Sequence, residues 1–229
     1  MSVRIHVAGH YTRPLRRRFL EVARTPGPKH IALSGGRTPR DFFHLIATQC
    51  RNDVPWDRVV LFQVDERCVP PDHVDSNWRQ VQELILDCVP EVRAHRMRAE
   101  TPGAAEEYED LLHAELSRDS TGVPIFDLVL LGLGADGHTA SLFPDTAALT
   151  ETRRSVVRNT VPQLKTERIT LTYPVLNAAR HRWFILRGAD RRDVFQQVLS
   201  GEHPAGRIRD PEWFVEPEVI EEEPAPKQK

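Results

Sequence analysis

The segment from Phe126 to Asp145 combines an apolar run of strand length with polar residues that could do chemistry. Its first half, 126–131, is mostly apolar and is followed by glycines, which predicts a strand buried on both faces. Its second half places Asp136 and His138 just past the carboxyl end of that strand, where open α/β sheets bind ligands. An imidazole there can act as a general base or acid near neutral pH.

Three glycines in this segment satisfy the G-x-G-x-x-G spacing of dinucleotide-binding loops: Gly132, Gly134 and Gly137. A nucleotide site needs a long helix after the third glycine, and then a strand that ends in an acidic residue. Pro144 stops any such helix, and no apolar strand follows before the charged run 151–154. We therefore predict no nucleotide cofactor, and the sequence gives no indication of another cofactor or of a metal.

A second candidate site is the glycine-containing loop from Ser34 to Asp41, which follows the strand-like run 30–33. Thr38 could cap the helix expected after it and form a capping box with Asp41. Unpaired N–H groups at that helix start, with Arg37 or Arg40 nearby, would form a phosphate-binding site. A tight turn that binds nothing explains the same residues equally well.

A third cluster, Asp65-Glu66-Arg67, comes directly after the strand-like run 59–62. Charged residues at the end of a buried strand could orient a base or hold an anion. Taken alone, such a run is more often a solvated loop. The neighbouring segments decide between these interpretations.

Strand-like and helix-like segments alternate along the chain. The strands are expected at residues 5–8, 30–33, 59–62, 126–131, 169–172 and 183–186. The helices are expected at 15–22, after Pro39, from Asn77 as its cap to Pro90, from Thr101 to Glu115, and at 194–199. A polar loop is expected from Asp65 to Ser76. This alternation predicts an α/β fold with a mostly parallel sheet and helices on both of its faces.

Length and composition favour one domain. The 229 residues are 40% hydrophobic and carry a net charge of −2, which gives no indication of a nucleic-acid partner. We place the domain at residues 1–215 and predict a flexible acidic, proline-containing tail at 216–229. The cysteines, Cys50, Cys68 and Cys88, are odd in number and suggest reduced thiols in the cytoplasm. No long apolar stretch or signal peptide indicates a membrane partner.

These segments, in kind and order, resemble the 6-phosphogluconolactonases. The resemblance extends over about residues 30–200 and is most specific around His138. It rests on Ser34-Gly35-Gly36-Arg37-Thr38-Pro39, Asp65-Glu66-Arg67-x-Val69-Pro70 with Ser76-Asn77, Gly132-x-Gly134-x-Asp136-Gly137-His138-Thr139-Ala140-Ser141-Leu142-Phe143-Pro144, and Arg168-Ile169-Thr170-Leu171-Thr172. It implies a Rossmann-like fold and metal-free hydrolysis of 6-phospho-D-glucono-1,5-lactone in the pentose phosphate pathway. The expected partner is a small sugar phosphate, and the expected oligomeric state is a monomer or a weak homo-oligomer.

Two departures from the family pattern concern the phosphate. The family's loop usually reads Ser-Gly-Gly-Ser-Thr-Pro, whereas Arg37 replaces its second serine here. Arg191 stands where the family usually has lysine. Both changes keep or add positive charge, although a guanidinium holds two oxygens where an ammonium acts as a point charge. Which cation contacts the phosphate is left open.

Two rival functions share this fold. Glucosamine-6-phosphate deaminases look similar through Asp-Gly-His but continue with Asn-Glu-Pro, and Leu142-Phe143 cannot supply that carboxylate. Sugar-phosphate-sensing domains would bind without hydrolysis, but they normally bring a DNA-binding segment, for which we expect no room before the first strand.

The resemblance also implies roles for individual residues. His138 would be the general base for water and then the acid for the ring oxygen. Asp136 or Asp65 would orient it or the substrate, although Asp136 could equally serve only to make the turn. Arg67 or glycine N–H groups would stabilise the oxyanion. The expected substrate- and phosphate-binding residues are Ser34, Gly35, Gly36, Arg37, Thr38, Asn77, Arg168 and Arg191.

Overall fold

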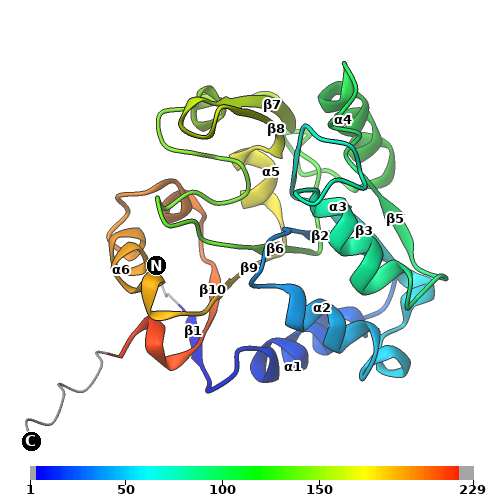
Figure 1. Cartoon of the computed structure of the whole chain (residues 1–229). Helices are drawn as coiled ribbons and strands as arrows, with labels where there is room; N and C mark the ends of the chain where they lie inside the picture. Colours follow the sequence, from blue (N-terminus) through cyan, green and yellow to red (C-terminus); the bar gives the residue numbers. More distant parts are fainter. Residues whose placement is uncertain (1–3, 222–229) are drawn as a thin grey trace, which may run out of the picture.

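A seven-stranded sheet forms the centre of the molecule, for which the computed structural model describes residues 4–221 (Figure 1). Every neighbouring pair of strands in it is parallel. The strands, in spatial order, are β1 (Arg4–Val7), β10 (Glu212–Val215), β9 (His181–Leu186), β6 (Leu128–Leu131), β2 (Lys29–Leu33), β3 (Val59–Gln63) and β5 (Arg93–His95). The predicted parallel α/β fold is confirmed.

Helices cover both faces of the sheet. They are α1 (Thr12–Ala23), α2 (Arg40–Ala47), α3 (Asn77–Val81), α4 (Ala104–Glu115), α5 (Tyr173–Ala178) and α6 (Arg192–Leu199), and a π-helical turn, Gln82–Leu86, continues α3. The core on one face contains α1 and α2, whereas α4, α5 and α6 pack against the other. In β6, Leu128 and Leu130 face the first layer, and Val129 and Leu131 face the second. This two-sided burial explains the uninterrupted apolar run.

A second, antiparallel sheet covers part of the α4 side. It pairs β4 (Asp65–Arg67) with β8 (Thr166–Leu171), and β8 with β7 (Val156–Val161). The prediction of an irregular loop from residue 65 was therefore wrong for its first three residues. Their partner strand lies about a hundred positions along the chain (Asp65 faces Thr170), and local sequence patterns do not report such pairing. The strands β5, β7 and β10 were also not predicted.

Two predicted helix caps are different in the structure. Ser76, not Asn77, caps α3, because the Ser76 hydroxyl accepts the Arg79 N–H. The capping box expected at Thr38 is absent, since α2 begins after Pro39 without a side-chain cap. Asp41 instead accepts a hydrogen bond from Arg187, 2.8 Å away. This carboxylate thus pairs with a cation that is distant in the sequence.

The carboxyl-terminal boundary lies later than predicted. Pro217–Val219 forms a 3₁₀ turn, and Val219 is fully buried in the core. An apolar residue that packs in this way extends the domain beyond residue 215. The rest of the predicted tail, 222–229, lies outside the described residues. Between residues 4 and 221, no helix is both long and apolar enough to cross a bilayer.

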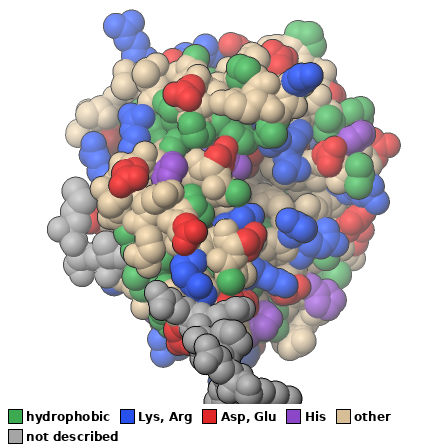
Figure 2. Space-filling view, turned by 60° about the vertical axis from the view of Figure 1, so that its left-hand side comes forward, with side chains coloured by type: hydrophobic (Ala, Val, Ile, Leu, Met, Phe, Trp, Pro, Cys, Tyr) green, Lys and Arg blue, Asp and Glu red, His purple; other side chains and the backbone are tan. Residues whose placement is uncertain are grey.

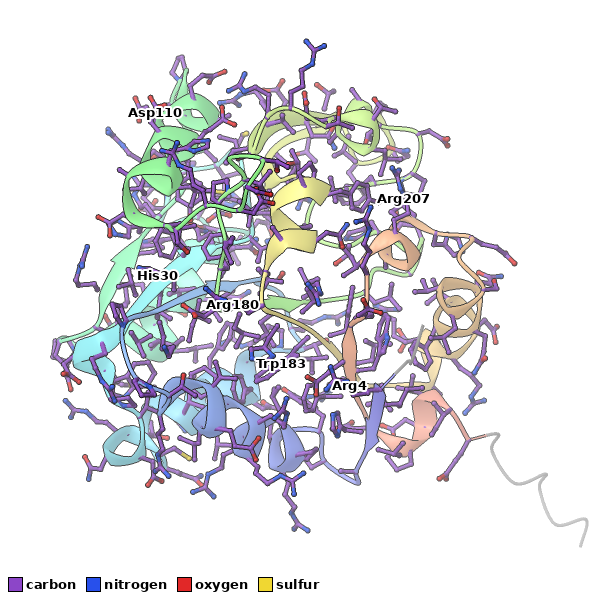
Figure 3. All side chains as sticks on the ribbon, turned by 180° about the vertical axis from the view of Figure 1, so that it is seen from behind. Arg4, His30, Asp110, Arg180, Trp183 and Arg207 are labelled. Carbon is purple, nitrogen blue, oxygen red and sulfur yellow. The ribbon has the colours of Figure 1, made fainter. Side chains whose placement is uncertain are left out.

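Three half-buried histidines predict acid sensitivity. Burial lowers the pKa values of His30, His95 and His181, although the charge of Asp127 opposes the shift at His30. Asp127 lies 3.8 Å from the His30 ring and 3.5 Å from the Arg180 guanidinium; His30 and Arg180 are labelled in Figure 3. A lowered folded-state pKa means that the unfolded chain takes up protons first, so stability is lost as pH falls below about 6.5.

We expect the melting temperature to be lower at about pH 5.5 than at about pH 7.5, by about 2–4 °C for each kcal/mol lost. Thermal scans of the wild type and His30→Gln check this result, because the variant should lose part of the pH dependence. His44→Gln, at an exposed position on α2, is the matched control. Equal pH dependence in all three proteins would contradict the assignment.

Candidate active site

The loops after β2, β3 and β6 meet at one cavity of about 200 Å³. These strands lie side by side and parallel, so their carboxyl ends reach the same edge of the sheet. Residues from β4 and β8, with Asn77 at the start of α3 and Arg191 in the turn after β9, complete the wall. The lining residues are Ser34, Gly35, Gly36, Arg37, Thr38, Pro39, Asp65, Arg67, Asn77, Gly132, Leu133, Gly134, His138, Ala140, Arg168 and Arg191.

A tight turn after β6 presents His138. The Gly134 N–H donates to the His138 carbonyl, and the Gly137 N–H donates to the Gly134 carbonyl. A Cβ on Gly134 would lie 2.1 Å from His138 Nδ1, so only glycine leaves room for the ring. Gly137 has a φ of +76°, which also favours glycine. The G-x-G-x-x-G pattern therefore serves the placement of a histidine here.

Asp136 both shapes the turn and contacts the imidazole. Its Oδ1 accepts the His138 backbone N–H at 3.2 Å and lies 2.5 Å from His138 Nδ1. Partial burial would raise the Asp136 pKa, but the hydrogen bond and charge of His138 outweigh it and lower that pKa. An ionised Asp136 that accepts from Nδ1–H leaves Nε2 of the ring free to accept a proton. Asp136 thus both holds the turn and contacts the ring.

An aromatic ring supports the imidazole from one side. Phe143 stacks on His138 with ring centroids 3.9 Å apart and an angle of 23° between the planes. The Arg168 guanidinium lies 5.7 Å from the centroid of the same Phe143 ring. Phe143 occupies the position where the deaminase pattern requires a carboxylate, so the imidazole has a hydrophobic neighbour there.

Asp65 enters the cavity from β4 and is held by the His138 loop. Its Oδ2 accepts a hydrogen bond of 2.7 Å from Ser141 Oγ, and both residues are buried. The Ser141 backbone is fixed in turn by β8 and β7, since its N–H donates to Thr170 Oγ1 and its carbonyl accepts from Asn159 Nδ2. Ser141 thus connects the loop of His138 to the carboxylate of Asp65.

We expect Ser141→Ala to lower kcat/KM by about tenfold. A hydrogen bond to a charged group contributes about 1.5–3 kcal/mol, and about 1.4 kcal/mol is a factor of ten. Steady-state kinetics with the lactone that the resemblance implies as substrate, with the exposed Ser200→Ala as control, check this. Unchanged kcat/KM in Ser141→Ala would show that Asp65 needs no such support.

The loop after β2 packs closely against the start of α3. A Cβ on Gly35 would lie 2.1 Å from Asn77 Oδ1, so the glycine admits the amide side chain. Gly36 has a φ of +106°, and its N–H donates to Gln80 Oε1 at 3.0 Å. In this structure the Gly36 N–H is therefore bound by a side chain from α3.

Positive charge predominates around the cavity, whose lining includes four arginines and one aspartate. The Arg191 side chain pairs with Asp190, and Arg67 Nη1 donates to the Asp75 carbonyl. Burial lowers the pKa of Arg168, although nearby Asp65 opposes this. Buried polar atoms without a partner include Nε of Arg67 and of Arg168. On the face shown in Figure 2, arginine and lysine side chains (blue) gather around a hollow.

The structure brings together the residues that the sequence nominated. The residues expected to act in catalysis or to bind the substrate all line the cavity except Asp136, which contacts His138 Nδ1. Arg40 does not line it but faces an adjoining depression with Arg37. Sequence reasoning missed Gln80 and the role of Ser141. A polar residue one turn into a helix, and a serine beside a catalytic motif, are both too common to be informative alone.

Comparison with known proteins gives the family. The sequence profile described as "Glucosamine-6-phosphate isomerases/6-phosphogluconolactonase" matches residues 5–219. The chain belongs to this family. It is 34% identical over 203 residues to a 6-phosphogluconolactonase from Chlamydia pneumoniae, which covers 84% of this chain and 77% of the relative. The corresponding protein from Synechocystis sp. is 39% identical over 198 residues and covers 84% of this chain and 79% of the relative.

Solved structures are similar to this chain over nearly its whole length. The 6-phosphogluconolactonase from Trypanosoma brucei superposes with a TM-score of 0.84 at 27% identity, covering 95% of this chain and 98% of that one. A monomeric glucosamine-6-phosphate deaminase superposes with a TM-score of 0.75 at 17% identity. This second likeness concerns the fold alone, so the side chains at the cavity must distinguish the two activities.

Proposed function

We propose that this protein is a 6-phosphogluconolactonase, which hydrolyses 6-phospho-D-glucono-1,5-lactone to 6-phospho-D-gluconate. The observation that carries the proposal is that one cavity holds both an arginine-rich anion site and His138, with Asp136 on its Nδ1. Family membership and the two 6-phosphogluconolactonase relatives support the same reaction. As expected from the cysteines, we place this activity in the cytoplasm.

The phosphate group would anchor the substrate in the cavity. The loop Ser34–Thr38, with Arg37, Arg168 and Arg191, provides positive charge and donors for a phosphate dianion. Asn77 and Asp65 are placed to contact sugar hydroxyls. Fixing the remote phosphate orients C1 toward His138, and such positioning lowers the barrier without any covalent step.

The chemical step would use one imidazole twice. His138 Nε2 accepts a proton from water as the water oxygen attacks C1, and the carbonyl oxygen becomes negative. The Arg67 guanidinium, with its partnerless buried Nε, would stabilise that oxyanion. When the C1–O5 bond breaks, the imidazolium returns its proton to the ring oxygen. Asp136 holds the tautomer and stabilises the imidazolium during this cycle.

The test is acid release from freshly prepared 6-phosphogluconolactone, followed against its spontaneous hydrolysis. Acceleration by the wild-type protein supports the proposal. Binding of 6-phosphogluconate without acceleration would favour a sugar-phosphate sensor. Release of ammonia from glucosamine 6-phosphate would favour a deaminase.

A further inference from the structure

A buried carboxylate that does not face the cavity lies next to two residues that do. Glu66, the middle residue of β4, is only 2% exposed. Its neighbours Asp65 and Arg67 line the cavity. A buried carboxylate is costly unless donors surround it, so its partners indicate what it does.

Five donors from three segments converge on Glu66. Its Oε1 accepts the backbone N–H groups of Arg67 and Asn77, each at 2.8 Å. Its Oε2 accepts from the Trp78 N–H at 2.7 Å, from Gln63 Nε2 at 2.8 Å and from Ser76 Oγ at 3.0 Å. These bonds connect β4 to the end of β3 and to the first residues of α3.

Two of these donors belong to residues with side chains in the cavity. Asn77 Nδ2 donates to the Asp65 carbonyl at 2.9 Å, and Asn77 Oδ1 is buried without a partner beside Gly35. The Arg67 guanidinium reaches the cavity with a partnerless Nε. The Glu66 carboxylate therefore fixes the backbone of Asn77 and Arg67. Asn77 Oδ1 is the partnerless acceptor and Arg67 Nε the partnerless donor that this backbone carries.

The side chain of Gln63, one of the five donors to Glu66, is itself held in place. Gln63 Oε1 accepts the Met97 N–H at 2.7 Å, while the Gln63 amide nitrogen donates to Glu66. Both polar ends of the Gln63 side chain are thus used, and its orientation is fixed. A continuous chain of hydrogen bonds leads from the backbone after β5, through Gln63 and Glu66, to the start of α3.

We propose that Glu66 is a positioning residue of the active site: its carboxylate holds the start of α3 on β4 and thereby places Asn77 and Arg67 in the substrate cavity. This inference rests on the proposed function. A carboxylate suits the task because it accepts from several N–H donors at a helix start, where the helix dipole also favours negative charge.

The test compares Glu66→Gln, Asn77→Ala and the double variant with the wild type. Glutamine keeps the size but replaces one acceptor oxygen with an NH₂ group, which must face N–H donors. We expect kcat/KM to fall about tenfold to a hundredfold in Glu66→Gln. Because Glu66 acts partly through Asn77, the double variant should lose clearly less than the product of the two single effects. Glu167→Gln, exposed on β8, is the control.

A merely structural role gives a different pattern. It would lower the melting temperature and leave kcat/KM of the folded protein unchanged, or give losses that multiply in the double variant; either result overturns the inference. Amide exchange at Asn77 and Trp78 should be faster in Glu66→Gln, and unchanged exchange would also contradict it. If Glu66→Gln does not fold, Glu66→Asp replaces it in the same test. The aspartate side chain is one methylene shorter, so its oxygens lie farther from the five donors.

Binding of 6-phosphogluconate, measured by calorimetry with the same proteins, separates this inference from the proposed function. A wild type that binds the acid but does not accelerate lactone hydrolysis would contradict the lactonase proposal alone. In that case the dissociation constant of 6-phosphogluconate is compared instead. The double variant should weaken binding clearly less than the product of the effects of Glu66→Gln and Asn77→Ala. Multiplicative losses in an active enzyme would contradict the role of Glu66 alone.

Discussion

Replacing His138 with asparagine is expected to lower kcat by about 10²- to 10⁴-fold, which is the contribution of a positioned general acid–base group. Asparagine has a similar shape and can still donate to Asp136, but it cannot take a proton from water. Binding of 6-phosphogluconate should therefore stay within about threefold of the wild type, because this change removes an interaction specific to the transition state. Initial rates above spontaneous hydrolysis, with calorimetric binding of the product, measure both quantities.

The exposed His44→Asn on α2 is the matched control for this substitution and should behave as the wild type. If His138→Asn retains most of its kcat, another group takes the proton, and the role given to the imidazole is wrong. If it loses product binding as strongly as kcat, the histidine acts in binding rather than in chemistry.

Arg168→Gln is expected to raise KM, and to weaken binding of 6-phosphogluconate, by about 10- to 100-fold. Hydrogen bonds between charged groups contribute about 1.5–3 kcal/mol, and a half-buried guanidinium is poorly screened by solvent. The Arg168 side chain has a buried Nε without a partner and faces the cavity, so it is ready to bind an anion. Steady-state kinetics and calorimetry provide the measurement.

Arg168→Lys separates charge from geometry. It keeps the positive charge but loses the planar fork, so an intermediate loss is expected. Arg17→Gln, at an exposed position on α1, is the control and should leave both constants unchanged. A fall in kcat without a change in KM would place Arg168 at the reacting carbonyl instead of at the phosphate.

The local parts of the fold could be predicted because their signals are local. The run from Phe126 to Leu131 indicated a strand buried on both faces, and β6 has alternate residues in the two cores. Helices with an apolar stripe, such as α1 and α2, were found for the same reason. The strands β5 and β10 were not, since such short segments owe their conformation to partners that are distant in sequence. The strand β7 was also missed, although its partner β8 follows it directly.

For the candidate site, the amino-acid pattern was enough to indicate the loops involved: glycines, an imidazole and arginines follow parallel strands, and parallel strands end at one edge. The contacts among these loops became clear only from the folded chain. Ser141 on Asp65, Gln80 on Gly36 and five donors on Glu66 join residues from different segments. The physical reason is that a buried polar group needs a hydrogen-bond partner, and the folded chain determines which donor or acceptor lies close enough to provide it.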